Sequence, residues 1–318
     1  MHRSRKIYLF GTIFSLSLSF LLTVWAFAET LPSKEGSLMR FRQSRFAIGL
    51  WVEPPLDEFA DQRYRELADA NFTLVIGGFA ANTPEKILDQ IALCERYGLD
   101  LIAFAPNTPP EQLPDSTCLW GYGLKDEPHS DEFPELRKRV DAIRVTRPGK
   151  LAYINLFPNY ARPAALGTNS YEEYVERFVN EVNPDVLSMD HYPLFKPGVD
   201  GRDEYCRNLE TMRTFSLRQN VPFWNFFNAM PFGPHTDPTE DQMRWQIFTS
   251  LAYGAKGVMY FCYFTPRGNE FPKGGAIIAT DGVRTRHWYQ ARRLNEQLKN
   301  LSPVLMCLTS EAVIRLKP

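Results

Sequence analysis

Apolar and polar positions along this chain fall into long blocks, with little residue-by-residue alternation. Eight apolar runs of strand length cover 46–52, 72–79, 99–106, 118–128, 150–158, 185–193, 221–230 and 256–266. Amphipathic segments separate most of them; in 83–98, for example, Thr83 suits an N-cap, Pro84 the first turn and Gly98 the stop. Apolar strands that lack alternation and are separated by helices predict a parallel sheet covered on both faces.

Eight strand–helix units in about 260 residues predict a (β/α)8 TIM barrel, which we assign to residues 46–305. A doubly wound open sheet is the alternative. If that sheet bound nucleotides, a glycine-rich phosphate turn would follow the first strand, and "VEPPLDEF" contains none. Residues 306–318 look like the first strand of an appended β-domain.

The first 28 residues have the pattern of an export signal. A basic stretch at 3–6 precedes an apolar run at 7–27 that ends in the small-residue motif "AFA". We expect cleavage after residue 28, followed by a polar linker at 29–45. An uncleaved anchor is the alternative, because the run is about long enough to span a bilayer. No later stretch is long and apolar enough to span a bilayer. We therefore expect a periplasmic or extracellular protein without stable membrane insertion after cleavage.

Composition narrows the possible partners. Loss of the three positive charges of the leader moves the formal net charge from -1 to about -4, and no basic block recurs, which argues against nucleic acid as a partner. The histidines are not paired at metal-ligand spacing, and we expect no metal and no cofactor. The cysteine count is odd and the spacings are wide, which favours buried free thiols over disulfides. The five are Cys94, Cys118, Cys206, Cys262 and Cys307. The oligomeric state stays open.

Polar and aromatic residues gather where the predicted strands end, and barrel enzymes carry their chemistry at the carboxyl ends of strands. Such a mixture suits a sugar, because rings stack on its C–H faces while acids and amides bind its hydroxyls. The candidates are Trp51, Asp126, Glu127, Asn155, Asp190, His191, Tyr192, Trp224, Asn225 and Tyr263.

Each of these candidates also has a structural interpretation. The adjacent Asp126 and Glu127 could complement the dipole of the next helix, although Ser130 and Asp131 are better caps. Asp190 and His191 could form a structural pair that locks a loop. Trp51 and Trp224 could be core residues, and Asn155 and Asn225 could be turn formers.

The strand end "GYGLKDEP" is similar to the Asn-Glu-Pro strand end of clan A glycoside hydrolases, and "SMDHYP" and "GAKGVMYFCYF" look like β-galactosidase-like barrels of that superfamily. The resemblance implies Glu127 as the acid/base. It also implies a hydroxyl-binding role for Asp126, which stands where the clan usually has Asn.

The sequence departs from that clan at its seventh strand, where the clan carries a nucleophilic Glu and "PFWNFFNAM" has no carboxylate. Asp190 is the best second carboxylate, ahead of Glu53 and Glu270. Asp190 lies on a strand end two strands away from Glu127, so we expect a gap wider than a retaining pair uses, with Asp190 as the general base of an inverting enzyme. The predicted function is an exported glycoside hydrolase acting on an oligo- or polysaccharide. A non-catalytic carbohydrate-binding barrel is the main alternative, and a metal-assisted hydrolase the third.

Overall fold

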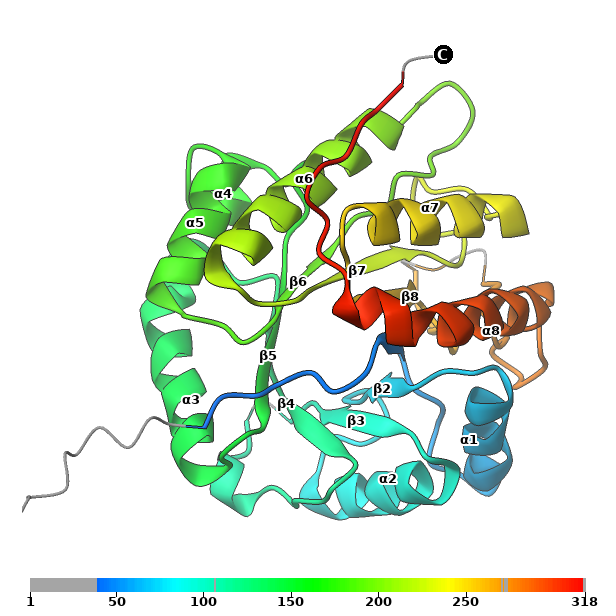
Figure 1. The fold of residues 1–318 in the computed structure, drawn as a ribbon. Helices are drawn as coiled ribbons and strands as arrows, with labels where there is room; N and C mark the ends of the chain where they lie inside the picture. Colours follow the sequence, from blue (N-terminus) through cyan, green and yellow to red (C-terminus); the bar gives the residue numbers. More distant parts are fainter. Residues whose placement is uncertain (1–38, 106, 270, 272–273, 317–318) are drawn as a thin grey trace, which may run out of the picture. The chain divides into compact units, whose positions relative to one another are not determined.

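The computed structural model describes residues 39–105, 107–269, 271 and 274–316, and within them eight parallel strands close into one barrel (Figure 1). The strands are β1 Ala47–Leu50, β2 Leu74–Ile76, β3 Asp100–Ala103, β4 Leu119–Asp126, β5 Leu151–Leu156, β6 Leu187–Asp190, β7 Phe223–Asn228 and β8 Gly257–Phe261. They follow one another in chain order, and β8 pairs with β1. The predicted TIM barrel is confirmed. The open sheet is wrong, because it would leave two strand edges unpaired.

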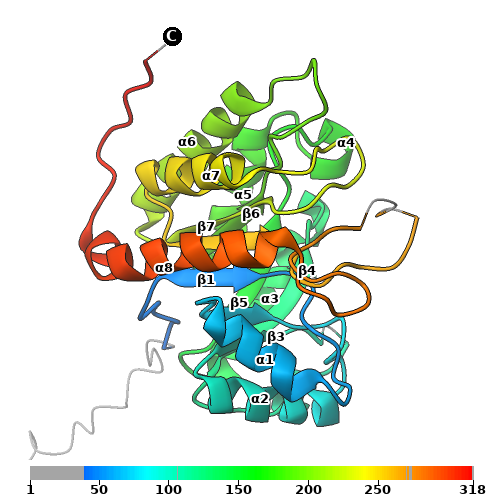
Figure 2. The same cartoon turned by 90° about the vertical axis from the view of Figure 1, so that its right-hand side faces the viewer.

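Helices cover the outside of the barrel, as the two perpendicular views show (Figures 1 and 2). They are α1 Ala60–Asp69, α2 Pro84–Tyr97, α3 Phe133–Thr146, α4 Pro163–Leu166, α5 Tyr171–Glu181, α6 Arg202–Gln219, α7 Glu240–Ala252 and α8 Arg286–Cys307, with short 3-10 turns η1 Pro110–Gln112 and η2 Ser130–Glu132. The signals predicted around α2 are confirmed, since the Thr83 side chain caps it and Gly98 ends it at a φ of 68°. None of the helices in the described part of the chain has the length and apolarity needed to cross a membrane.

Large aromatic side chains fill the interior of the barrel near the amino ends of the strands. Trp224, the second residue of β7, lies 5.9 Å from Tyr153 of β5 and 6.3 Å from Trp120 of β4, measured between ring centroids. The neighbouring position on β8 is Gly257, where a Cβ would lie 2.6 Å from the Trp224 ring. Only glycine leaves room for the indole there, so this end of the barrel is a packed core.

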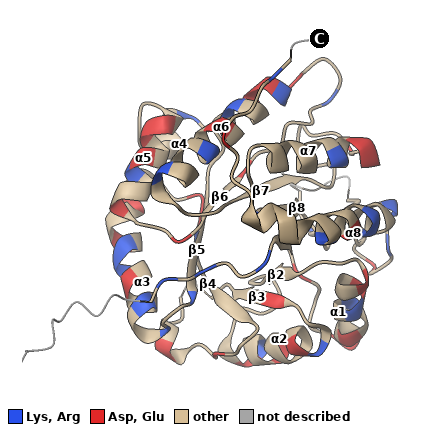
Figure 3. Ribbon diagram, viewed as in Figure 1, with Lys and Arg blue, Asp and Glu red and all other residues tan. Residues whose placement is uncertain are grey.

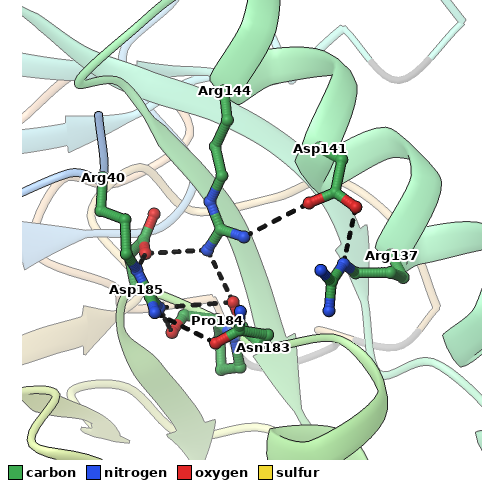
Figure 4. Close-up of polar contacts among 7 residues, drawn as sticks. All are labelled: Arg40, Arg137, Asp141, Arg144, Asn183, Pro184 and Asp185. Carbon is green, nitrogen blue, oxygen red and sulfur yellow. Dashed lines mark hydrogen bonds and ion pairs between the residues drawn. The ribbon is translucent and has the colours of Figure 1, made fainter. Parts of the chain in front are cut away.

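The amino end of the barrel also pairs its buried charges (Figure 4). The guanidinium of Arg144 on α3 donates at 2.8 Å to the carboxylate of Asp185, just before β6, and both side chains are almost fully buried. Arg40, from the segment before β1, contacts the same carboxylate and donates to the carbonyl of Pro184. A buried charge without a partner would be costly, so this arrangement ties three segments together and contributes to stability.

On the outside, lysines and arginines alternate with acidic residues along the helices (Figure 3). In this view both signs of charge therefore share the outer surfaces of the helices.

The C-terminal segment does not form the predicted strand. Helix α8 continues to Cys307, and residues 308–316 are neither helix nor strand. They run across α6, where Arg213 donates to the carbonyl of Ser310 and Arg315 pairs with Asp203. An appended β-domain stays a prediction.

All five cysteines are free, as predicted. Their predicted burial is confirmed for Cys94, Cys206 and Cys262, but Cys118 is half-buried and Cys307 is exposed. The predicted signal peptide and residues 29–38 of the linker lie outside the described residues.

Candidate active site

Three carboxylates meet at the carboxyl end of the barrel, and one amide holds two of them. The Nδ2 of Asn155, on β5, donates to Oδ1 of Asp126 on β4 at 3.1 Å and to Oδ1 of Asp190 on β6 at 2.9 Å. Its Oδ1 accepts from Ser188 at 2.9 Å, so the amide cannot flip without losing all three bonds. Asn155 therefore acts as a bridge between the two strand ends that flank its own.

Glu127 leaves the end of β4 in an unusual backbone conformation. Its φ is 48°, in the left-handed region that residues other than glycine rarely adopt, and its N–H donates to the carbonyl of Asn155 at 2.9 Å. Strain of this kind is kept where the surroundings hold it, often at functional sites. The helix-cap interpretation does not apply, because the turn that follows has its capping box on His129 and Glu132.

Electrostatics at this mouth favour protonation. Burial and the neighbouring Asp126 charge raise the pKa of Glu127 to about 7, against a hydrogen bond with Asp190 that lowers it. Burial, with the charges of Glu127 and Asp126, raises the pKa of Asp190 well above its usual range. Burial also raises the pKa of Asp126, against the hydrogen bond from Asn155, which lowers it. Lys125, whose charge lowers the pKa of Asp126, pairs with Glu132 at 2.8 Å.

Glu127 follows the end of β4 and Asp190 is the last residue of β6, on either side of β5. Asn155 of β5 donates to Asp190 and to Asp126, the residue before Glu127. The interaction with Asp190 lowers the pKa of Glu127, against burial and the Asp126 charge, which raise it. The expected separation of the two carboxylates, and inversion with Asp190 as the general base, stay predictions.

A cavity of about 540 Å³ opens beyond the carboxyl ends of β1 to β3. Three aromatic rings line it: Trp51 stands edge-on to Phe79 at 5.3 Å and to Phe104 at 5.9 Å. On its other side Trp51 contacts Phe226, whose Cα pairs with that of Asp190. Trp51 and Phe104 are half-buried and Phe79 is exposed, so these rings are accessible and could stack on a sugar, as predicted for Trp51.

Tyr192 forms a second wall of the mouth. Its ring packs on Phe232 at 5.1 Å and Phe261 at 5.0 Å, and the residue is 8% exposed. Burial and the nearby carboxylates raise the pKa of its phenol, so the hydroxyl stays protonated and can donate. No described residue is hydrogen-bonded to that hydroxyl, which leaves the donor free for a ligand.

Trp224 and Asn225 are not at the mouth, contrary to our prediction. Strand β7 begins at Phe223, so Trp224 lies at the amino end of the barrel, fully buried, with Nε1 donating to Gln43. The side chain of Asn225 points outward, where its Nδ2 donates to Tyr205 of α6 and to Ser250 of α7. We had counted both residues as lying at the carboxyl end of the strand, whereas they are its second and third residues.

His191 and Tyr263 also point away from the mouth. The Nδ1 of His191 lies 2.9 Å from Oδ1 of Asn208 on α6, and burial lowers the pKa of the ring to about 4, so it is neutral at pH 7. Tyr263 is fully buried against Phe72, outside the barrel. Both residues support the structure, which corrects their predicted binding roles.

Glu53 is a structural residue. Its Oε1 accepts hydrogen bonds from four consecutive backbone N–H groups, at residues 78–81, and the side chain is 2% exposed. Val52 before it has a φ of 60°, a strained turn for a β-branched residue, and this turn carries Glu53 toward the loop. Glu53 thus fixes the loop that bears Phe79. Glu270, the other weak candidate, lies outside the described residues.

Sequence reasoning missed Phe79, Phe104 and Ser188. Ser188 lies two positions before Asp190 on β6, and the period of two on a strand could have placed both on one face. Phe104 needs Gly123 on β4, where a Cβ would lie 1.8 Å from its ring, and such a pairing across strands leaves no local signal. Within residues 39–105, 107–269, 271 and 274–316, no group of three metal-ligating side chains is arranged to hold an ion.

Comparisons with known proteins agree with this geometry. The sequence profile of the Glyco_hydro_42 family, described as beta-galactosidase, matches residues 137–301, just over half of the chain. No curated protein matches.

Solved structures similar to this chain include three bacterial glycosidases. The beta-galactosidase from Bacillus circulans sp. alkalophilus has a TM-score of 0.63 at 13% identity, over 82% of this chain and 57% of that one. The beta-galactosidase from the psychrophilic Marinomonas ef1 has a TM-score of 0.61 at 11% identity, over 83% and 61%. The exo-beta-1,4-mannosidase Op5Man5 from Opitutaceae bacterium strain TAV5 has a TM-score of 0.56 at 14% identity, over 83% and 62%. The chain thus spans less than two thirds of these structures, and the likeness establishes a shared fold.

Proposed function

The chain belongs to the Glyco_hydro_42 family, described as beta-galactosidase, and on that premise we propose that it hydrolyses O-glycosidic bonds of an oligo- or polysaccharide. Glu127 is the general acid/base, and Asp126 and Asp190 are the carboxylates that support it. The observation that carries the proposal is the raised pKa of Glu127, about 7, on a strained strand end at the barrel mouth. A general acid needs such a pKa to hold its proton near neutral pH.

The aromatic cavity supports an oligosaccharide as the substrate. Its volume of about 540 Å³ and its rings at Trp51, Phe79 and Phe104 suit a pyranose unit beside the one being cleaved. Export is part of the proposal and rests on the basic and apolar pattern of residues 1–28.

A non-catalytic carbohydrate-binding barrel is the second candidate. Strand β7 ends in Asn228, whereas clan A glycoside hydrolases carry a nucleophilic Glu at the end of this strand, and this difference favours binding without cleavage. The aromatic cavity would serve either function.

Hydrolysis of aryl glycosides and of polysaccharides separates the two candidates. Glu127→Gln should lower turnover of substrates with poor leaving groups by about several hundredfold, since general acid catalysis contributes roughly 10²–10⁴-fold. The control is Glu135→Gln on α3, whose side chain is exposed and pairs with Lys138, and it should be fully active. In the wild type, kcat/KM should fall as pH rises through about 7, when Glu127 loses its proton. If the wild type and both variants all bind glycans saturably without turnover, the protein is the non-catalytic carbohydrate-binding barrel.

A further inference from the structure

A buried carboxylate holds the loop between β2 and α2. Oε1 of Glu53 accepts from the N–H groups of residues 78–81 at 2.8, 2.9, 2.7 and 3.2 Å, and the side chain is 2% exposed. These four residues belong to neither a helix nor a strand, so no backbone ladder fixes them. Hydrogen bonds to an ionised acceptor are stronger than neutral ones, and four of them on one oxygen set the conformation of the loop.

This loop carries or supports two of the three rings of the aromatic cavity. Phe79 is one of its four residues, and the Phe79 ring stands edge-on to Trp51 at 5.3 Å between centroids. Gly78 has a φ of 122°, and a Cβ there would lie 2.7 Å from the Cβ of Phe104. The loop backbone therefore packs directly against Phe104. A shift of the loop would move the Phe79 ring and remove the support of the Phe104 ring.

The third ring lies on the segment that carries Glu53 itself. The backbone of Trp51 is tied to β8 and to the residues after it, since its N–H donates to the carbonyl of Tyr260 at 3.1 Å and its carbonyl accepts from Tyr263 at 2.9 Å. Val52 then turns the chain at a φ of 60°, so that Trp51 lines the cavity while Glu53 reaches the loop. Glu53 thus links the segments that bear all three rings.

The cavity adjoins the strand that carries the acids. The Phe104 ring lies against Gly123 of β4, where a Cβ would be 1.8 Å from it, and Asp126 ends the same strand three residues later. Neighbouring strands lie about 4.8 Å apart, so a chain of a few sugar units is long enough to span from Glu127 to the cavity.

The fold alone gives little reason for this arrangement. Removing a carboxylate from water is costly, and apolar packing of similar volume often stabilises a protein as well or better. The ring on the loop that Glu53 holds is also largely on the surface, because Phe79 is 52% exposed. An exposed ring adds little to the core, whereas a ring held in place beside a cavity can stack on a sugar without a cost for ordering it.

We propose that Glu53 is the positioning residue of the aromatic cavity, which it preforms for a sugar unit that an oligosaccharide has and an aryl monosaccharide glycoside lacks. The inference rests on the proposed glycosidase function and deepens it, because it assigns the preference for longer substrates to a residue that takes no part in the cleavage. Glu53 touches no substrate and acts through the loop that it holds.

Hydrogen exchange tests the anchor directly. In the wild type, the amides of residues 78–81 should exchange roughly 100-fold more slowly than those of an exposed loop, because each donates to a buried oxygen. In Glu53→Gln they should exchange about 10-fold faster than in the wild type. Gln offers a neutral acceptor and places an N–H2 group where Oε2 lies buried without a partner among the described residues. Free exchange in the wild type would overturn the inference, even if the variant did not fold.

Calorimetry measures the sugar affinity apart from turnover. The β-1,4-linked galacto-, manno- and glucotetraoses are titrated into Glu127→Gln, and the tightest binder is then titrated into Glu127→Gln carrying Glu53→Gln as well. We expect its Kd to rise about 5–10-fold, the loss of roughly one stacked ring. With Glu127 intact, Glu53→Gln should raise KM for that tetraose by about the same factor and leave kcat unchanged. KM and kcat for 4-nitrophenyl β-glycosides should change by less than about twofold.

Three further variants separate positioning from a general loss of stability. Glu66→Gln is the matched control, because Glu66 on α1 is also a buried carboxylate, pairs with Arg284 at 2.8 Å, and should leave the tetraose Kd unchanged. Phe79→Ala should weaken the tetraose about 5-fold, and adding it to Glu53→Gln should cause little further loss, since both act through one ring. Glu53→Asp keeps the charge but is one methylene shorter, and it takes the place of Glu53→Gln if that variant does not fold.

The outcomes distinguish this inference from the function on which it rests. Weaker tetraose binding in Glu53→Gln, with faster exchange of the loop amides and unchanged kinetics on aryl glycosides, supports the inference. Suppose instead that aryl glycosides are cleaved in a Glu127-dependent way. Then the absence of tetraose binding, an equal Kd with and without Glu53→Gln, or an equal loss on both substrates overturns the inference and leaves the glycosidase. Tetraose binding that depends on Glu53, in a protein that cleaves no glycoside, overturns the glycosidase and leaves the anchored cavity. Neither binding nor cleavage overturns both.

Discussion

Replacing Glu127 by Gln should stabilise the fold above neutral pH while it removes activity. Burial and the Asp126 charge raise the pKa of this carboxyl from 4.5 to about 7. The folded state therefore holds the proton more tightly than the unfolded chain does, and stability is lost as pH rises from about 4.5 through about 7. At 1.36 kcal/mol per pKa unit, the full cost to the ionised folded state is about 3.4 kcal/mol. Because the side chain is partly solvated, we expect about 1–2 kcal/mol.

Urea unfolding followed by tryptophan fluorescence measures this difference, at pH 5, 6, 7 and 8. At pH 5 the carboxyl of the wild type is protonated, so wild type and Glu127→Gln should have similar free energies of unfolding. At pH 8 the variant should be more stable by about 1–2 kcal/mol. Titration of the other groups is common to both proteins and cancels in the difference. Glu135→Gln on α3 is the control and should follow the wild type. A constant difference between wild type and Glu127→Gln from pH 5 to pH 8 would refute the assigned pKa.

Two further variants test where the aromatic residues act. Trp224→Ala should lower the free energy of unfolding by about 3–5 kcal/mol, because it empties a packed site at the amino end of the barrel, and KM of the folded fraction should not change. Unchanged stability with a raised KM would return Trp224 to the sugar site. Trp51→Ala should raise KM for oligosaccharides by about 5–10-fold, for roughly 1 kcal/mol of lost stacking, and change KM for an aryl monosaccharide little. An equal change in KM for both substrates would show that Trp51 does not bind a sugar unit that only the oligosaccharide has.

The barrel was predictable because it rests on local chemistry repeated eight times. Each strand is a short apolar run and most are followed by an amphipathic helix, and signals such as Thr83 and Gly98 act within a few residues of their helix. Closure was predictable for the same reason, since eight such units match one known architecture. The end of a strand could also be predicted where a proline follows it, as Pro128 follows Asp126 and Glu127.

A residue reaches the barrel mouth only if it lies near the carboxyl end of its strand and its side chain points into the barrel. The sequence of a buried apolar strand carries little information about either property. On β7, every residue from Phe223 to Asn228 is buried, so no polar alternation marked which side chains enter the barrel. Trp224 and Asn225 were misplaced for this reason. His191 follows Asp190 directly and therefore points to the opposite face, toward α6.

The sequence by itself determined the eight-stranded barrel and the acids that end β4 and β6, because strand and helix periodicity and the turn signals are local properties of the chain. Only the tertiary structure joined Asp126 and Asp190, through the two hydrogen bonds donated by Asn155 from the strand between them, and held Glu127 through its N–H on the Asn155 carbonyl. The same assembly raised the pKa of Glu127, since desolvation and a neighbouring charge exist only once distant segments enclose the site. A carboxylate acquires its chemical role from that enclosure, and the linear sequence does not record it.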